Sequence, residues 1–167
     1  HVTYLEVGAK RDGTITALKA DTLANLGGVL STIAPGIPTT LYGRMLSGPY
    51  RFPAIHCHVR GVYTNTGMVD AYRGAGRPEA TYLVERAVDL VAAELGLDPA
   101  EVRRVNFIPP EAFPYEPAND LLRGLAYDTG EYEKPLDRAL ELCDYAELRA
   151  EQERARAEGR LVGIGLA

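Results

Sequence analysis

The sequence predicts an α+β fold in which antiparallel strands pack against helices. Three patterns indicate it: two extended segments joined by Arg11-Asp12-Gly13, an apolar–polar alternation over residues 55–64, and apolar residues at three- and four-residue steps over residues 78–95. Strands grouped ahead of helices, without regular alternation of the two, are typical of this class.

A β-hairpin over residues 2–21 is the first element expected. Gly13 supplies the positive φ angle that a tight reversal requires. The next strand is expected over residues 55–64, where the period of two places Cys57 on one face and His56 and His58 on the other. We therefore expect one face of this strand to lie in the core.

The helix expected over residues 78–95 has Pro78 in its first turn and Gly96 after its end. Its apolar stripe should be buried, because no other segment has so continuous an apolar face. The stripe consists of Leu83, Val84, Ala87, Val88 and Val91. A short helix should follow, with Asp98 as N-cap and Glu101 at the reciprocal capping position.

The last third of the chain should return to helix over residues 135–158. Pro135 begins a first run, and Asp144 with Glu147 can cap a second. Residues 161–167 resemble the beginning of another strand.

These elements divide the chain into three parts. Residues 1–108 form an α+β segment, residues 109–134 a Pro-rich connector, and residues 135–167 a helical segment leading into a strand. The connector is aperiodic, so it is either ordered by contact or a mobile loop.

Composition excludes several classes of function. The chain has 167 residues, and its 18 Lys and Arg against 23 Asp and Glu give a net charge of −5, the wrong sign for a general nucleic-acid or anionic-membrane surface. The uncharged run of residues 22–43 contains glycines and prolines, so we expect loop and no membrane span. Cys57 and Cys143 show no metal or redox spacing, which suits reduced thiols and a cytoplasmic location.

The segment AYRGAGRP, residues 71–78, has the chemistry of an anion cradle. Glycines allow close backbone approach, the following helix N-terminus carries partial positive charge, and Arg73 and Arg77 can add charge-assisted hydrogen bonds. It lacks the Lys of a Walker loop and the third glycine of a dinucleotide fingerprint. A Gly-rich turn with structural arginines is the alternative that the pattern leaves open.

No metal-ligating residue is assigned. The triplet His56-Cys57-His58 has suitable ligand types, but on a strand the thiol points away from both imidazoles. The three side chains therefore cannot converge on one ion without a bulge.

The AYRGAGRP segment and the helix after it closely resemble the molybdenum-binding large subunit of the xanthine dehydrogenase and aldehyde oxidase family. More narrowly, they resemble the carbon-monoxide-dehydrogenase-type large subunits. DGTITALKAD, VRGVYTNT, FIPPEAFPY and GRLVGIGLA also fall in the family's order. The resemblance thus covers essentially the whole chain.

The resemblance implies that Ala71, Tyr72, Arg73 and Gly74 contact a molybdopterin cofactor, expected in its cytosine dinucleotide form. Backbone groups of this loop would approach the oxo and dithiolene side of the molybdenum. Carbon monoxide dehydrogenases carry a copper-ligating cysteine here, in the pattern AYRCSFR, and that position is Gly74. A molybdenum–copper carbon monoxide oxidase is therefore not expected.

The resemblance also places three residues at the substrate pocket. Ala75 stands where purine-oxidising members have a stacking aromatic residue, and Leu41 where they have a substrate-binding arginine. Arg44 lies close enough in sequence to restore a cation after a small shift in register. Xanthine is therefore not the expected substrate.

The function implied is that of an internal segment of a molybdenum hydroxylase, which inserts oxygen from water into an aldehyde or an N-heteroaromatic compound. The family's general-base glutamate lies outside this chain, so no catalytic base is assigned and the isolated chain should be inactive. [2Fe–2S] centres and FAD would be held by partner subunits. The alternative is a stand-alone, non-catalytic binding domain with the same fold.

Overall fold

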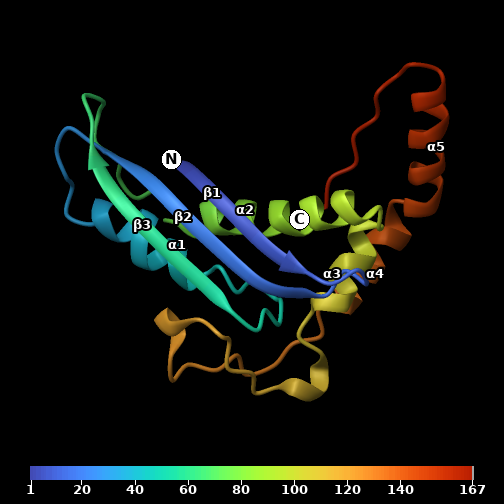
Figure 1. Cartoon of the computed structure of the whole chain (residues 1–167), viewed down its shortest axis with the longest axis horizontal. Coiled ribbons are helices and arrows are strands. Elements are labelled where there is room, and N and C mark those ends of the chain that lie inside the picture. The colour runs from blue at the N-terminus through green and yellow to red at the C-terminus, as the bar shows by residue number, and fades with distance from the viewer. Residues whose placement is uncertain (167) are drawn as a thin grey trace.

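The computed structural model describes residues 1–166, and three strands form its only sheet there (Figure 1). The strands are β1 (Val2–Ala9), β2 (Ile15–Gly27) and β3 (Ile55–Tyr63), with β2 in the centre. β1 and β2 pair antiparallel as the predicted hairpin. The predicted mixture of helices and strands is confirmed.

The direction of β3 is a correction to the predicted antiparallel arrangement, because β3 runs parallel to β2. Parallel neighbours require a long crossover connection. Residues 28–54 form this connection. They contain the short helical segments η1 (Ala34–Gly36), η2 (Ile37–Leu41) and α1 (Tyr42–Arg44), and they return the chain to the end of the sheet where β2 begins.

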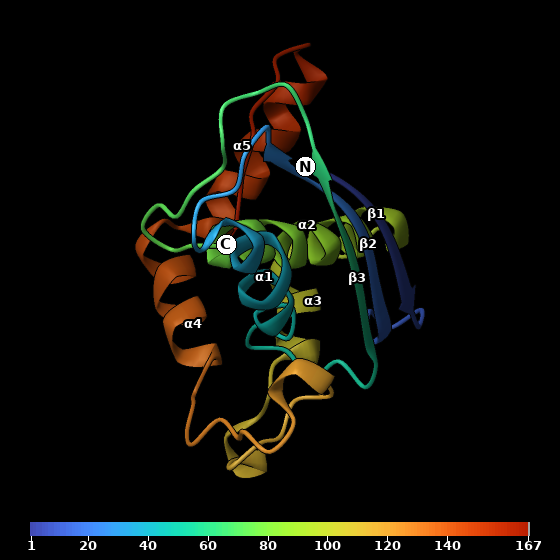
Figure 2. The same ribbon diagram turned by 90° about the vertical axis from the view of Figure 1, so that its left-hand side faces the viewer.

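Helix α2 (Arg77–Leu95) packs on one face of the sheet, and the other helices lie on the same side of it (Figure 2). It ends at Gly96, whose φ of 67° is the left-handed conformation of a helix C-cap. The predicted apolar stripe is buried, from Leu83 to Val91. It packs in one core with residues of β2 such as Leu18. None of the described helices is both long and apolar enough to cross a bilayer.

Helix α3 (Pro99–Asn106) begins as predicted, with the Asp98 side chain accepting a hydrogen bond from the amide of Ala100 at 2.8 Å. Glu101 does not complete the reciprocal cap, because its carboxylate binds Arg104 instead. The buried Asn106 side chain then joins α3 to the hairpin, accepting from the amide of Ile15 at 2.8 Å and donating to the carbonyl of Gly13.

The Pro-rich connector is ordered by contact. It contains two short 3-10 segments, η3 (Pro110–Ala112) and η4 (Asp120–Leu122), and an isolated bridge between Tyr115 and Tyr127. The buried Asn119 amide donates to the carbonyl of Gly43 at 2.9 Å. This contact holds the connector against the end of the crossover.

The last third forms two helices, α4 (Glu133–Leu142) and α5 (Tyr145–Ala157), as the sequence predicted. Asp144 stands at the N-cap of α5 but makes no capping bond, because its φ of 49° is left-handed. Glu147 binds Arg154 on the same helix and does not form a cap.

The strand expected over residues 161–167 is not formed over residues 161–166, and residue 167 lies outside the described part. Among the described residues, this segment pairs with no strand. Instead, side chains bind its carbonyl groups: Gln152 donates to Val162 at 2.9 Å and Arg103 donates to Leu166 at 2.9 Å.

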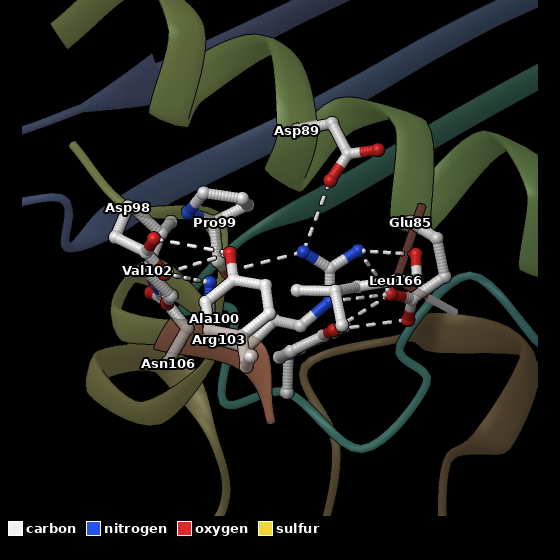
Figure 3. A network of polar contacts seen from close by, with 11 residues as sticks. Glu85, Asp89, Asp98, Pro99, Ala100, Val102, Arg103, Asn106 and Leu166 are labelled. Atoms are coloured by element: carbon white, nitrogen blue, oxygen red, sulfur yellow. Dashed lines mark hydrogen bonds and ion pairs between the residues drawn. The ribbon is translucent and has the colours of Figure 1, made fainter. Parts of the chain in front are cut away.

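Arg103 joins three parts of the fold: α2, α3 and the segment at residues 161–166 (Figure 3). Its side chain is only 4% exposed and pairs with Glu85 and Asp89 of α2, at 2.8 and 3.0 Å. It also donates to the carbonyls of Pro99 and Leu166. The guanidinium donates four hydrogen bonds, and Glu85 and Asp89 balance its charge, so this buried cation is paired and hydrogen-bonded.

Candidate cofactor-binding site

The loop before α2 has an unusual backbone conformation. Gly74, Ala75 and Gly76 follow one another with φ angles of 109°, 41° and 91°. A positive φ is uncommon for a residue with a side chain, as at Ala75, and strain of this kind gathers at functional sites. The strained conformation therefore makes this loop a candidate binding site.

Gly76 allows the loop to pack directly against the crossover connection. A Cβ atom at Gly76 would overlap the carbonyl oxygen of Ile37 and lie 2.8 Å from the amide nitrogen of Tyr42. Both neighbours are backbone atoms that cannot turn aside. The absence of a side chain thus brings the start of α2 directly onto η2, with Leu41 beside it.

The loop also offers backbone hydrogen-bond donors. Among residues 1–166, the amides of Tyr72, Arg73 and Gly74 donate to no protein acceptor. They precede α2, a helix of 19 residues whose N-terminus favours negative charge. The side chain of Tyr72 is 87% exposed, and Arg73 is exposed as well. Exposed, unpaired amides ahead of a helix N-terminus can bind an anion.

Two contacts inside the loop keep it in this shape. The amide of Ala75 donates to the carbonyl of Tyr72 at 2.9 Å. The Arg77 guanidinium donates to the carbonyl of Gly74 at 3.1 Å, so Arg77 supports the loop.

Asp70 anchors the loop at its beginning. Its carboxylate accepts from the hydroxyl of Ser31 and from the amide of Ala71, both at 2.7 Å. These hydrogen bonds, that of Ser31 first, lower the pKa of Asp70, so it remains a charged acceptor.

Comparison with known proteins identifies the family. Residues 1–107 match the family described as the molybdopterin cofactor-binding domain. The chain belongs to this family. The match includes β1 to β3, the crossover, the loop at residues 71–76, α2 and α3.

The family resemblance to molybdenum-binding large subunits is confirmed by curated relatives. This domain is 42% identical to the carbon monoxide dehydrogenase large chain of Hydrogenophaga pseudoflava, over 96% of this chain and 20% of the relative. It is 36% identical to the 6-hydroxypseudooxynicotine dehydrogenase complex subunit gamma of Paenarthrobacter nicotinovorans, over 99% of this chain and 21% of that subunit. The chain spans about a fifth of the length of these relatives.

Solved structures agree with the curated relatives. Quinoline 2-oxidoreductase from Pseudomonas putida 86 superposes with a TM-score of 0.81 at 28% identity, over 95% of this chain and 20% of that chain. Carbon monoxide dehydrogenase from Oligotropha carboxidovorans gives 0.79 at 35% identity, over 94% and 20%. The stand-alone, non-catalytic interpretation is therefore not favoured.

The domain brings only part of the predicted site together. Ala71 to Gly74 form the open loop, and Leu41 lies beside Gly76 on η2. Arg44 is exposed and lines a separate cavity of about 370 Å³ with Thr81 and Glu85 of α2. The roles of these residues remain predictions.

The largest cavity described among residues 1–166 measures about 610 Å³ and lies between β1 and the first half of α2. The sequence did not predict it. Tyr42 and Thr22 line it, and their hydroxyl oxygens lie 3.3 Å apart. Burial raises the pKa of Tyr42, which remains a neutral phenol. No sequence signal marked Tyr42, since it lies in an aperiodic, glycine- and proline-rich run.

The His56-Cys57-His58 triplet has the geometry that strand alternation predicted. Cys57 packs against the core, where burial raises the pKa of its thiol, while both histidines are exposed on the other face. Within residues 1–166, no three His, Cys, Asp or Glu side chains gather into a metal-ligating group.

Proposed function

We propose that this domain holds the molybdopterin cofactor of a molybdenum hydroxylase through residues 71–74. The whole enzyme would insert oxygen from water into a C–H bond of an aldehyde or an N-heteroaromatic compound. The observation that carries the proposal is the loop itself, with three successive positive φ angles and the unpaired amides of Tyr72, Arg73 and Gly74.

The residues present fit an anionic cofactor. A Cβ atom at Gly74 would lie 2.8 Å from Pro78 Cγ, so the loop can hold its conformation only without a side chain there. The unpaired amides and the exposed Arg73 can bind anionic oxygen atoms. Arg77, bonded to Gly74, would keep the donors in position. When bound, the cofactor supplies the oxidation–reduction chemistry.

The substrate class follows from what the loop lacks. Gly74 has no thiol to bind copper, and the two cysteines of the chain, Cys57 and Cys143, lie on β3 and after α4. This argues against carbon monoxide oxidation, although carbon monoxide dehydrogenases are among the similar proteins. The resemblance places Ala75 and Leu41 where purine-oxidising relatives have a stacking ring and an arginine. We therefore propose a quinoline-like ring or an aldehyde as the substrate in place of xanthine.

We also propose the form of the cofactor and the partner subunits of the enzyme. The cofactor would be the cytosine dinucleotide form, and [2Fe–2S] and FAD subunits would accept the electrons in the cytoplasm. The family's base glutamate would come from outside residues 1–167. The names of two relatives, a large chain and a subunit of a complex, support such partners.

Gly74→Val in the whole enzyme tests the proposal. The clash with Pro78 should force the loop out of this conformation and so prevent cofactor binding, and molybdenum per purified protein should fall at least tenfold. Gly159→Val is the matched control, because Gly159 also has a positive φ, of 78°, but no atom lies within 4 Å of its Cβ position. Normal molybdenum in Gly74→Val, or an equal loss in both variants, would contradict the site.

The reaction class has its own test. The loaded enzyme should transfer ¹⁸O from labelled water into the product of an aromatic aldehyde or of quinoline, as mass spectrometry would show. Oxidation of carbon monoxide in place of both would contradict the proposed substrate class.

A further inference from the structure

Two histidines stand side by side on the outer face of the sheet. His56 and His58 alternate with the core-facing Cys57, so they lie on the face opposite α2. Two residues along a strand place their Cα atoms about 6.6 Å apart with both side chains on one face. Imidazoles at this spacing can reach a common point above the strand.

A carboxylate on the neighbouring strand orients one of them. Asp21 is the register partner of His58, and its Oδ1 lies 3.1 Å from His58 Nδ1. With Nδ1–H donating to Asp21, the lone pair of the ring is on Nε2. Metal-binding histidines show this arrangement, in which a carboxylate fixes the tautomer and raises ligand basicity. The His58 side chain is 51% exposed, so solvent reaches it.

The positive and negative side-chain charges around His56 and His58 cancel. Lys19, the register partner of His56, is paired with Glu6 on β1. Arg60 lies two residues further along the same face of β3 and adds one positive charge, which Asp21 offsets. Tyr4, opposite Asp21, is exposed and uncharged. A cation approaching the two rings therefore meets no net repulsion.

We propose that His56 and His58 chelate a divalent transition metal ion, Cu²⁺ or Zn²⁺, with Asp21 as the positioning residue of His58. Imidazole nitrogen is a preferred ligand of both ions. Solvent completes the coordination, since the described residues add no third protein ligand. The site lies across the sheet from α2 and is independent of the proposed cofactor loop.

The test is calorimetric titration of the whole purified protein with CuCl₂ and with ZnCl₂. His56→Asn leaves one ligand in place of a chelate, so the affinity should fall about 100-fold. His1→Asn, which alters the third histidine of the chain, should leave the affinity unchanged. All three side chains are exposed, so the substitutions should not disturb folding.

The role of Asp21 requires a separate readout. Asp21→Asn should weaken binding by about 10- to 100-fold. The Cu²⁺ electron paramagnetic resonance spectrum should still report two nitrogen ligands, whereas His56→Asn should reduce them to one.

Crystals soaked in ZnCl₂ would locate the ion. An anomalous peak about 2.0–2.1 Å from a nitrogen of both imidazoles would support the chelate. Equal affinity of wild type and His56→Asn, or a peak elsewhere on the surface, would overturn it.

Discussion

The start and the middle of α2 differ in how their polar groups are satisfied. At its start, residues 72–74 hold unpaired amides on a strained, exposed loop. Further along, Glu85 and Asp89 are bound by the buried Arg103. Among the described residues, no buried side-chain polar atom lacks a partner. The unpaired donors thus lie where a ligand can reach them, while Arg103 holds the middle of the helix in place.

Arg103→Met should have the largest effect on the stability of the protein. The change leaves two carboxylates of α2 with little solvent and no cation, which should cost about 3–5 kcal/mol of stability. Thermal unfolding of the purified protein should show a clear fall in Tm.

Arg104→Met is the control, since Arg104 pairs with Glu101 and Asp137 at a more exposed place and should cost about 1 kcal/mol or less. Equal falls in Tm for the two variants would contradict the special role of Arg103.

Substitutions at the two glycines that flank α2 separate the effect of the loop from that of the helix. Gly76→Ala would force the left-handed conformation on alanine and drive its Cβ into backbone atoms, at a cost of about 3 kcal/mol. Gly96→Ala has the same type of φ angle, but nothing lies within 4 Å, so about 1 kcal/mol is expected.

Differential scanning calorimetry and molybdenum analysis would measure both effects. Only Gly76→Ala should also lower molybdenum content. If Gly96→Ala lowers it as much, the effect comes from the helix as a whole rather than from the loop.

How far the sequence predicted the molecule depended on whether the signal was local. The helix over residues 78–95 and its buried stripe followed from periodicity and from the flanking Pro78 and Gly96. The loop at residues 71–76 was recognisable from its glycines. The parallel direction of β3 was not, because strand alternation says which side chains are buried but nothing about the direction of a partner.

The remaining differences came from long-range contacts. Arg103 reaches Leu166, 63 residues away, and so holds in place a segment that local pattern assigned to a strand. Tyr42 reaches Thr22 only because the crossover folds back on the sheet. Asp144 carried a capping residue type, but its left-handed φ prevents the bond. None of these contacts produces a periodic pattern of residues in the sequence.

Removal of a single hydroxyl group tests how the Arg103 network is shared. Tyr50 donates its hydroxyl to Glu85 at 2.9 Å while its ring stacks between Phe52 and Phe107. Burial, together with the neighbouring Glu85 carboxylate, raises the pKa of Tyr50, so it stays a neutral donor up to high pH. Tyr50→Phe keeps the stacking and removes only the donor, which should cost about 1 kcal/mol.

Tyr145→Phe is the matched change at the edge of the fold. Tyr145 donates to Asp98 at 3.0 Å, and partial burial raises its pKa to about 12. Its site is more open to water, so the loss should be about half that of Tyr50→Phe. Because both hydroxyls act far from residues 72–74, molybdenum content should stay at the wild-type value. A loss of molybdenum in Tyr50→Phe without a fall in Tm would mean that the Arg103 network reaches the loop, and the start and the middle of α2 would then act as one unit.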